Sequence, residues 1–314
     1  MKRHRNRDIC LQIRQRCADN PRVEQSVNAL LDEIADLPVV PAVALRVLQF
    51  AEADAGGAAE LAAILSADPA LSAKLIRVSN SAYYGFTRRF STVREAVIVL
   101  GFKQVRQMAV AASMVDAFRP ARSPIDGFDM DLFWGHALTV AMISELAARK
   151  FNAGSPADAF AAGILHDIGR LALRQARPRE FGRALAAARA TGEPLRDVER
   201  RETGFSHDDV GFALAVRWQF PAFLAAAIGQ RYAGPGDPRT GGLPVIMSMA
   251  DALAGHFGIN SGYESAAQPL RGLSPELAEL EAACGGMQSI LQRAHAFIES
   301  VTGTPGEWFE ARAA

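Results

Sequence analysis

Apolar residues recur along most of the chain at intervals of three and four, the spacing of one face of an α-helix. In LPVVPAVALRVLQFAE, for example, Val43, Val47 and Phe50 fall at helical spacing. Alternating runs of β-branched residues, which would indicate strands, are nearly absent, and the strong helix former alanine is frequent. We therefore predict an all-α protein built from many short helices.

Several predicted helix ends carry local signals. Asp68 precedes Pro69, and a residue before proline avoids the helical region, so two helices should meet there. In STVREAVIVLG, Thr92 and Glu95 have the spacing of a capping box at the start of a helix. Gly101 follows the last apolar residue of this segment and should end the helix.

The clearest predicted boundary is RPARSPIDGFDM, where Pro, Gly and Asp gather without helical periodicity. A chain of 314 residues at about 150 residues per domain also favours two units. The predicted organisation is a basic lead-in at 1–33, an N-terminal helical subdomain at 34–118, a linker at 119–130, a second helical subdomain at 131–260 and a C-terminal helical tail at 261–314.

Composition narrows the class of protein. The formal net charge is zero, which disfavours general attraction to nucleic acid or anionic lipid. Cys10, Cys17 and Cys284 are too few and too scattered for a disulfide framework. The basic N-terminus has no apolar core of a secretion signal, and no apolar run approaches the length of a membrane span. We expect a cytoplasmic protein.

Four potential metal ligands lie within apolar helical segments. His136 is in FWGHALTV, His166 and Asp167 are in AGILHDIG, and Asp251 is in MSMADALAG. A charge in such a segment is costly unless it is paired or bound to a metal. Histidine and carboxylate are ligands of borderline and hard divalent cations. Hydrogen-bonded core histidines would explain each position singly, but the four together favour a metal site.

The His166–Asp167 pair sets a condition on the backbone. Adjacent residues on a regular helix point about 100° apart, so both side chains can reach one ion only where the helix ends. We expect Gly169 to supply that end. Arg170 follows, and its fixed positive charge would suit a phosphate oxygen.

Longer segments of the chain resemble a known family. SADPALSAKLIRVSNSAYYG, TVREAVIVLGFKQVRQMA and AAGILHDIGRLAL are similar to blocks of HDOD domains, a branch of the HD superfamily of metal-dependent phosphohydrolases. The resemblance covers about residues 34–258, and the first block is absent from the wider superfamily. It implies an N-terminal helical subdomain packed on an HD-type helical subdomain. It also implies a regulatory role in bacterial signalling.

The resemblance further implies a ligand set for one divalent ion, Fe, Mn, Mg or Zn: His136, His166, Asp167 and Asp251, with His207 in GFSHDDVG as an additional candidate. The family often has a histidine pair where this chain has Gln230 and Arg231. That replacement disfavours a second ion and, with it, two-metal hydrolysis.

The segment from Ala73 to Arg106 is basic, and Glu95 is its only acid. Aromatic residues lie between the charges, a composition that suits an anionic ligand or a nucleic-acid backbone. The candidate contacts are Lys74, Arg77, Asn80, Arg88 and Arg89. A solvated helical face over an aromatic core explains the same pattern, and we favour that interpretation.

Three functions remain open. The favoured one is a regulatory module that binds a signalling protein or a small anionic ligand without turnover. The second is a metal-dependent phosphohydrolase in which Arg170 contacts the phosphate. The third is a nucleic-acid-associated regulator, which the zero net charge disfavours. The HDOD block and the residues at 230 and 231 favour the first function, and the complete ligand set favours the second.

Overall fold

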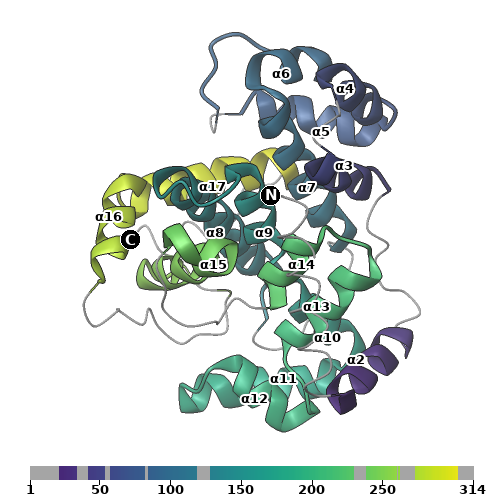
Figure 1. Ribbon diagram of the computed structural model, residues 1–314, viewed down its shortest axis with the longest axis vertical. Coiled ribbons are helices and arrows are strands. Elements are labelled where there is room, and N and C mark those ends of the chain that lie inside the picture. The colour runs from purple at the N-terminus through teal and green to yellow at the C-terminus, as the bar shows by residue number, and fades with distance from the viewer. Residues whose placement is uncertain are drawn as a thin grey trace.

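The computed structural model describes residues 21–33, 42–53, 57–81, 84–118, 128–229, 238–259, 261 and 273–302. Over these residues the chain consists of α-helices joined by short connections, without a strand (Figure 1). The all-α prediction is confirmed. None of the described helices has the length and apolar character needed to cross a membrane.

Five helices form the upper part of the molecule in Figure 1. They are α3 (Ala42–Ala53), α4 (Ala58–Ser66), α5 (Pro69–Ser79), α6 (Val93–Leu100) and α7 (Phe102–Phe118). The central helix of this group is α7, which packs against the other four and also against α9. Because α7 is buried along most of its length, it connects the upper helices with the rest of the fold.

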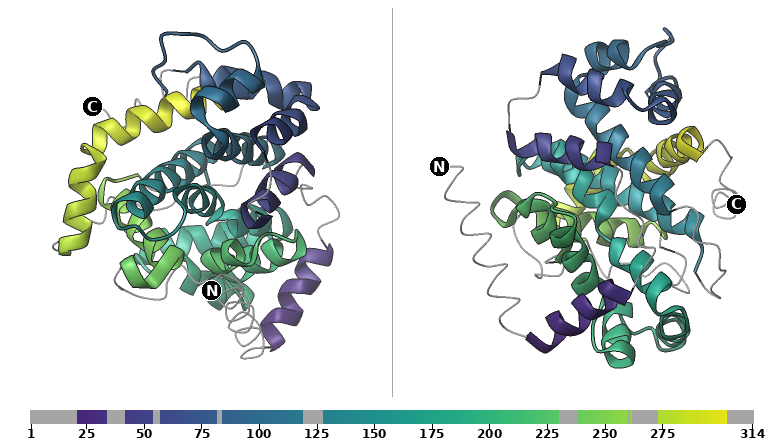
Figure 2. Two further views of the ribbon diagram at one scale, coloured as in Figure 1. Left: turned by 45° about the horizontal axis from the view of Figure 1, so that its top comes forward. Right: turned by 90° about the vertical axis from the view of Figure 1, so that its right-hand side faces the viewer.

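The middle and lower parts contain most of the remaining helices. These are α8 (Met130–Lys150), α9 (Pro156–Leu165), α10 (Ile168–Ala176), α11 (Pro178–Thr191), α12 (Leu195–Thr203), α13 (His207–Arg217), α14 (Ala222–Gly229) and α15 (Pro238–His256). The long, buried helix α8 packs on α9 and α15, while α10 packs on α13. The first described helix, α2 (Pro21–Glu33), lies against α10 and α13 at the lower end (Figures 1 and 2).

The last two helices are α16 (Pro275–Cys284) and α17 (Met287–Thr302). The first packs on α8 and α15. The second runs along α8 and also contacts α5 and α7, as the yellow helix in Figure 2 shows. The predicted tail therefore contacts both the upper and the middle helices.

The helix ends follow the sequence signals closely. Asp68 is extended, with φ −109° and ψ 104°, and its carboxylate accepts hydrogen bonds from the first turn of α5. The hydroxyl of Thr92 accepts from the Glu95 backbone N–H at 3.1 Å. The carboxylate of Glu95 accepts from the N–H of Ser91 at 2.9 Å. Gly101 ends α6 with a positive φ of 89°.

The predicted linker is only partly visible. Residues 119–127 of it lie outside the described residues, and Asp129 is already the N-cap of α8. The division into subdomains at this point stays a prediction. One direct connection between the upper and middle helices is an ion pair at 2.6 Å between the largely buried side chains of Arg106 on α7 and Asp158 on α9.

Candidate metal centre

The helical backbone is interrupted at His166 and Asp167, as it must be if both side chains are to reach one ion. The last residue of α9 is Leu165, His166 is its C-cap, and Asp167 precedes α10 with φ −104° and ψ 13°. The expectation that Gly169 would end the helix is wrong, because Gly169 lies inside α10. The break occurs two residues earlier, at Asp167.

Gly169 has another role, since it allows α10 and α13 to touch. A Cβ at this position would lie 1.9 Å from the carbonyl oxygen of His207 and 2.6 Å from the amide nitrogen of Gly211. No larger residue fits there without moving a backbone. Gly163 does the same where α9 crosses α8, because its Cβ would lie 2.4 Å from the Cα of Ala141. These two crossings bring the polar residues of four helices together.

The ligand atoms of three predicted residues converge. One ligand atom each of His136, His166 and Asp167 lies within 4.8 Å of the others, and all three residues are buried. The fourth residue, Asp251 on α15, is half-buried, and its Oδ1 lies 3.1 Å from Nε2 of His136. The structure therefore brings together three of the four residues, from α8 and the α9–α10 break, and Asp251 on α15 adjoins this group through its contact with His136.

Both imidazole rings are oriented by backbone carbonyl groups. Nδ1 of His136 lies 3.0 Å from the carbonyl oxygen of Ile259, and Nδ1 of His166 lies 2.6 Å from that of Gly163. Because a carbonyl can only accept, Nδ1 of each ring carries a proton, and in the neutral ring Nε2 is left facing a carboxylate, that of Asp251 for His136 and that of Asp167 for His166. Two such nitrogens beside the Asp167 carboxylate are donors that suit a divalent cation such as Zn or Fe. The residues therefore fit the ion that the resemblance implies.

Arg170 adds a positive charge to the same cluster. Its guanidinium is buried, with Nη1 2.9 Å from Oδ2 of Asp167, and it also donates to the hydroxyl of Ser261. The sequence suggested a phosphate contact for Arg170, a role that stays a prediction. In the structure its cation neutralises the central carboxylate of the candidate site.

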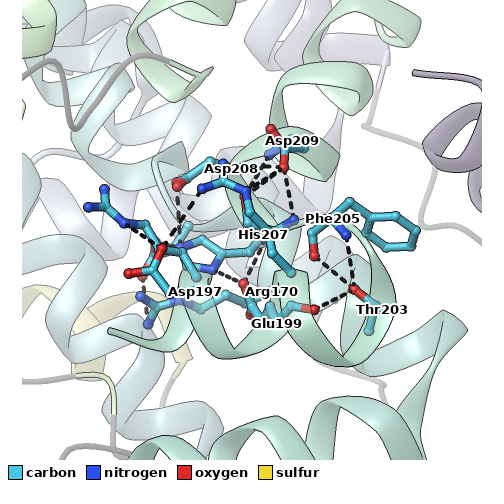
Figure 3. A network of polar contacts seen from close by, with 12 residues as sticks. Arg170, Asp197, Glu199, Thr203, Phe205, His207, Asp208 and Asp209 are labelled. Atoms are coloured by element: carbon cyan, nitrogen blue, oxygen red, sulfur yellow. Dashed lines mark hydrogen bonds and ion pairs between the residues drawn. The ribbon is translucent and has the colours of Figure 1, made fainter. Parts of the chain in front are cut away.

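His207 approaches Asp167 from the other side. Its Nε2 lies 3.6 Å from Oδ1 of Asp167, whereas Arg170 contacts Oδ2. Figure 3 shows His207 at the start of α13 between acidic residues of two helices. The N-terminus of α13 is fixed by a capping box between Ser206 and Asp209, which holds His207 in this place.

A residue that the sequence interpretation missed holds His207. Oε2 of Glu199 lies 2.5 Å from Nδ1 of His207 and accepts the His207 backbone N–H at 2.8 Å (Figure 3). The side chain of Glu199 is fully buried. The sequence signal that could have identified Glu199 is its helical spacing from Leu195 and Val198, which places this acid on the single apolar face of a strongly charged helix.

The basic segment predicted to bind anions is partly neutralised by ion pairs within the fold. Lys74 forms an ion pair with Asp116, and Arg88 pairs with Glu95 at 3.3 Å. The Asn80 amide donates to the Phe90 carbonyl at 2.9 Å and accepts from the Phe90 N–H at 2.7 Å, so its role is to hold the loop. Arg77 and Arg89 are exposed. Anion binding stays a prediction, and Gln230 and Arg231 lie outside the described residues.

Comparisons with known proteins agree with this architecture. An uncharacterized protein of Treponema pallidum is 25% identical over 194 residues, which is 62% of this chain but only 37% of that protein. An HDOD domain protein of unknown function from Geobacter sulfurreducens superposes with a TM-score of 0.71 at 24% identity, over 92% of this chain and 98% of its own.

A proposed phosphohydrolase from Shewanella amazonensis superposes with a TM-score of 0.63 at 25% identity. The match covers 88% of this chain and 97% of that protein. The sequence model of the HDOD domain matches residues 37–233. The chain therefore belongs to the HDOD domain family.

Proposed function

We propose that this HDOD protein acts in bacterial signalling by binding a protein partner or a small anionic ligand, without turnover. The observation that carries the proposal is the contact between Arg170 and Asp167 at 2.9 Å inside the buried cluster. A carboxylate that already neutralises a guanidinium attracts a metal ion less strongly, because the two cations repel each other at close range. The ion pair of Arg170 and Asp167 thus supports a structural role for this part of the cluster.

The second candidate is a metal-dependent phosphohydrolase, which the converging ligand atoms of His136, His166 and Asp167 favour. These residues, with Asp251, would hold one divalent ion, and the ion would supply a bound water of lowered pKa as nucleophile. The Shewanella relative is itself described as a proposed phosphohydrolase. For this reaction the guanidinium of Arg170 would have to leave the carboxylate of Asp167 and contact a phosphate oxygen instead.

Turnover decides between the two candidates. The protein purified without chelators is assayed against a panel of nucleotides and phosphoesters with Mn²⁺ or Fe²⁺, beside the double variant His166→Ala/Asp167→Ala. We expect the parent to hydrolyse no substrate faster than the double variant. Hydrolysis by the parent that disappears in the variant would establish the phosphohydrolase instead.

Metal affinity tests the part that Arg170 plays. Isothermal titration of the Arg170→Met variant with Mn²⁺ should show binding roughly tenfold tighter or more than in the parent, because the competing cation is gone. Arg170→Lys, which keeps the charge, is the matched control and should bind as weakly as the parent. Equal affinity in all three proteins would mean that Arg170 does not oppose the ion.

A further inference from the structure

Exposed apolar side chains gather in one part of the surface. Among the described residues, large hydrophobic side chains are exposed at Ile98 (70%), Val216 (53%), Val99 (48%) and Phe86 (45%). Three of the four lie on α6 or on the loop that precedes it. A group of exposed apolar residues on a soluble domain marks an interaction site more often than a scattered single residue does.

Two of these residues, Phe86 and Val99, line a cleft of about 450 Å³ between the upper and middle helices, and Ile98 is the chain neighbour of Val99 on α6. Phe86, Val99 and Leu100 line it from the loop and α6. Met142 and Leu146 line it from α8, and α17 also contributes. Figure 1 shows α6 in the upper part of the molecule, with α8 and α17 below it. The cleft is large enough for a few apolar side chains of a partner.

The loop that carries Phe86 is held in place. The ring of Phe86 packs edge-on against the buried ring of Phe90, with centroids 5.4 Å apart. The side-chain amide of Asn80 donates a hydrogen bond to the Phe90 carbonyl and accepts one from the Phe90 N–H. The N–H and hydroxyl of Ser91 both donate to Glu95 on α6. The apolar wall of the cleft is therefore organised before a partner arrives, which lowers the entropy cost of binding.

The surface around this wall is positive. Arg94 precedes Ile98 by one helical turn on α6 and is exposed, as are Arg89 and Lys103. The acid in this region, Glu95, is engaged by Ser91 and Arg88, and the hydrogen bonds from Ser91 lower the pKa of its carboxyl. On the opposite wall, Glu145 and Arg149 pair with each other at 2.5 Å, and Arg293 adds a further positive charge.

We propose that this cleft docks an acidic amphipathic helix of a partner protein. Val99 in the cleft and the exposed Ile98 beside it offer aliphatic side chains to the apolar stripe of such a helix, and its acidic flanks would face the exposed Arg89, Arg94 and Lys103. A single-stranded nucleic acid would need a row of exposed rings, yet Phe90 is buried. This inference rests on the proposed binding function and names the partner's chemistry.

The test is a selection from a phage-displayed library of helical peptides of about 20 residues, long enough to be helical. The full chain is the target, and the double variant Ile98→Asp/Val99→Asp is used for counter-selection. Enriched peptides should combine apolar residues at i and i+4 with flanking acids. Their affinity should fall at least tenfold in the double variant and remain unchanged in Val216→Asp, an exposed apolar position on α13 that does not line the cleft.

Charge is tested separately with Arg94→Glu, which should weaken the selected peptides and reduce the dependence of their affinity on salt. A 20-nucleotide single strand should bind no better to the parent than to this variant. The proposal is overturned by a selection without enrichment, by peptides that bind the double variant equally well, or by nucleic acid that competes for the cleft. If the parent protein hydrolysed a phosphoester, the proposed function without turnover would be wrong. The docking site would still stand if the selected peptides bound the parent and lost their affinity in Ile98→Asp/Val99→Asp.

Discussion

Two regions of this protein differ in which side chains they bury: one buries charged groups, and the other exposes apolar groups. Around the α10–α13 crossing, the side chains of Asp167, Arg170, Glu199 and His207 are buried and contact one another. Around α6, apolar side chains such as Ile98 are exposed among arginines and lysines. Buried charge and exposed apolar surface both cost stability, and natural proteins keep such features mainly where function needs them. The polar groups of the inner region contact one another inside the fold, whereas the exposed apolar groups of the outer region are suited to a partner.

For the inner region, the largest effect on stability is expected from the substitution Gly169→Ala. The added Cβ would lie 1.9 Å from the carbonyl oxygen of His207, so α10 and α13 must separate, and we expect a loss of about 3 kcal/mol or more of unfolding free energy in urea. Gly255→Ala on α15 is the control, because its Cβ meets nothing within 4 Å and alanine favours a helix. Equal stability of the two variants would show that the crossing is not tight.

Glu199 provides the next test, because its carboxylate holds both the backbone and the ring of His207. Glu199→Ala leaves buried donors without an acceptor, which should cost about 2–3 kcal/mol in chemical denaturation. Glu199→Gln keeps an acceptor oxygen and should lose less than half as much. If glutamine were as damaging as alanine, the charge and not the hydrogen bonds would hold His207.

The sequence predicted the parts of this fold that depend on local signals. The break at Asp68, the cap at Thr92 and the burial of His136 follow from residues next to one another or from helical spacing. The role of Gly169 could not be predicted, since it depends on which helix crosses α10. In α6, by contrast, helical spacing does place the buried Val93, Ala96 and Val97 on one face, with Ile98 one turn after the exposed Arg94, although hydropathy alone does not distinguish Ile98 from Val97.

The connection between the two regions can be measured at Arg106 and Asp158. A double-mutant cycle with Arg106→Met and Asp158→Asn should give a coupling free energy of about 1–2 kcal/mol, because both side chains are largely screened from water. Denaturation followed by both intrinsic fluorescence and circular dichroism would also show whether the regions still unfold together. A coupling near zero would mean that the upper and middle helices are held by apolar packing alone.

The smallest effect is expected at the loop of the outer region. Asn80→Ala removes two hydrogen bonds to the Phe90 backbone and should cost about 1 kcal/mol in thermal or chemical denaturation. The same change should weaken peptides selected for the cleft several-fold, because Phe86 is no longer held in place. Ser81→Ala, which removes only a hydroxyl bonded to the nearby Val78 carbonyl, is the control and should leave peptide affinity unchanged.

The break between α9 and α10 has a mechanical consequence. On one side, α9 is fixed to α7, α8, α14 and α15; on the other, α10 carries α11, α13 and α2. The two groups are joined at His166 and Asp167 and again where α13 packs on α14, which itself lies against α9. The four helices α9, α10, α13 and α14 thus form a closed ring of contacts, so any displacement of α10 has to be accommodated at the contact of α13 with α14 as well. With a rise of 1.5 Å per residue, α10 is about 13 Å long, so a tilt of one degree at Asp167 would move its far end by roughly 0.2 Å.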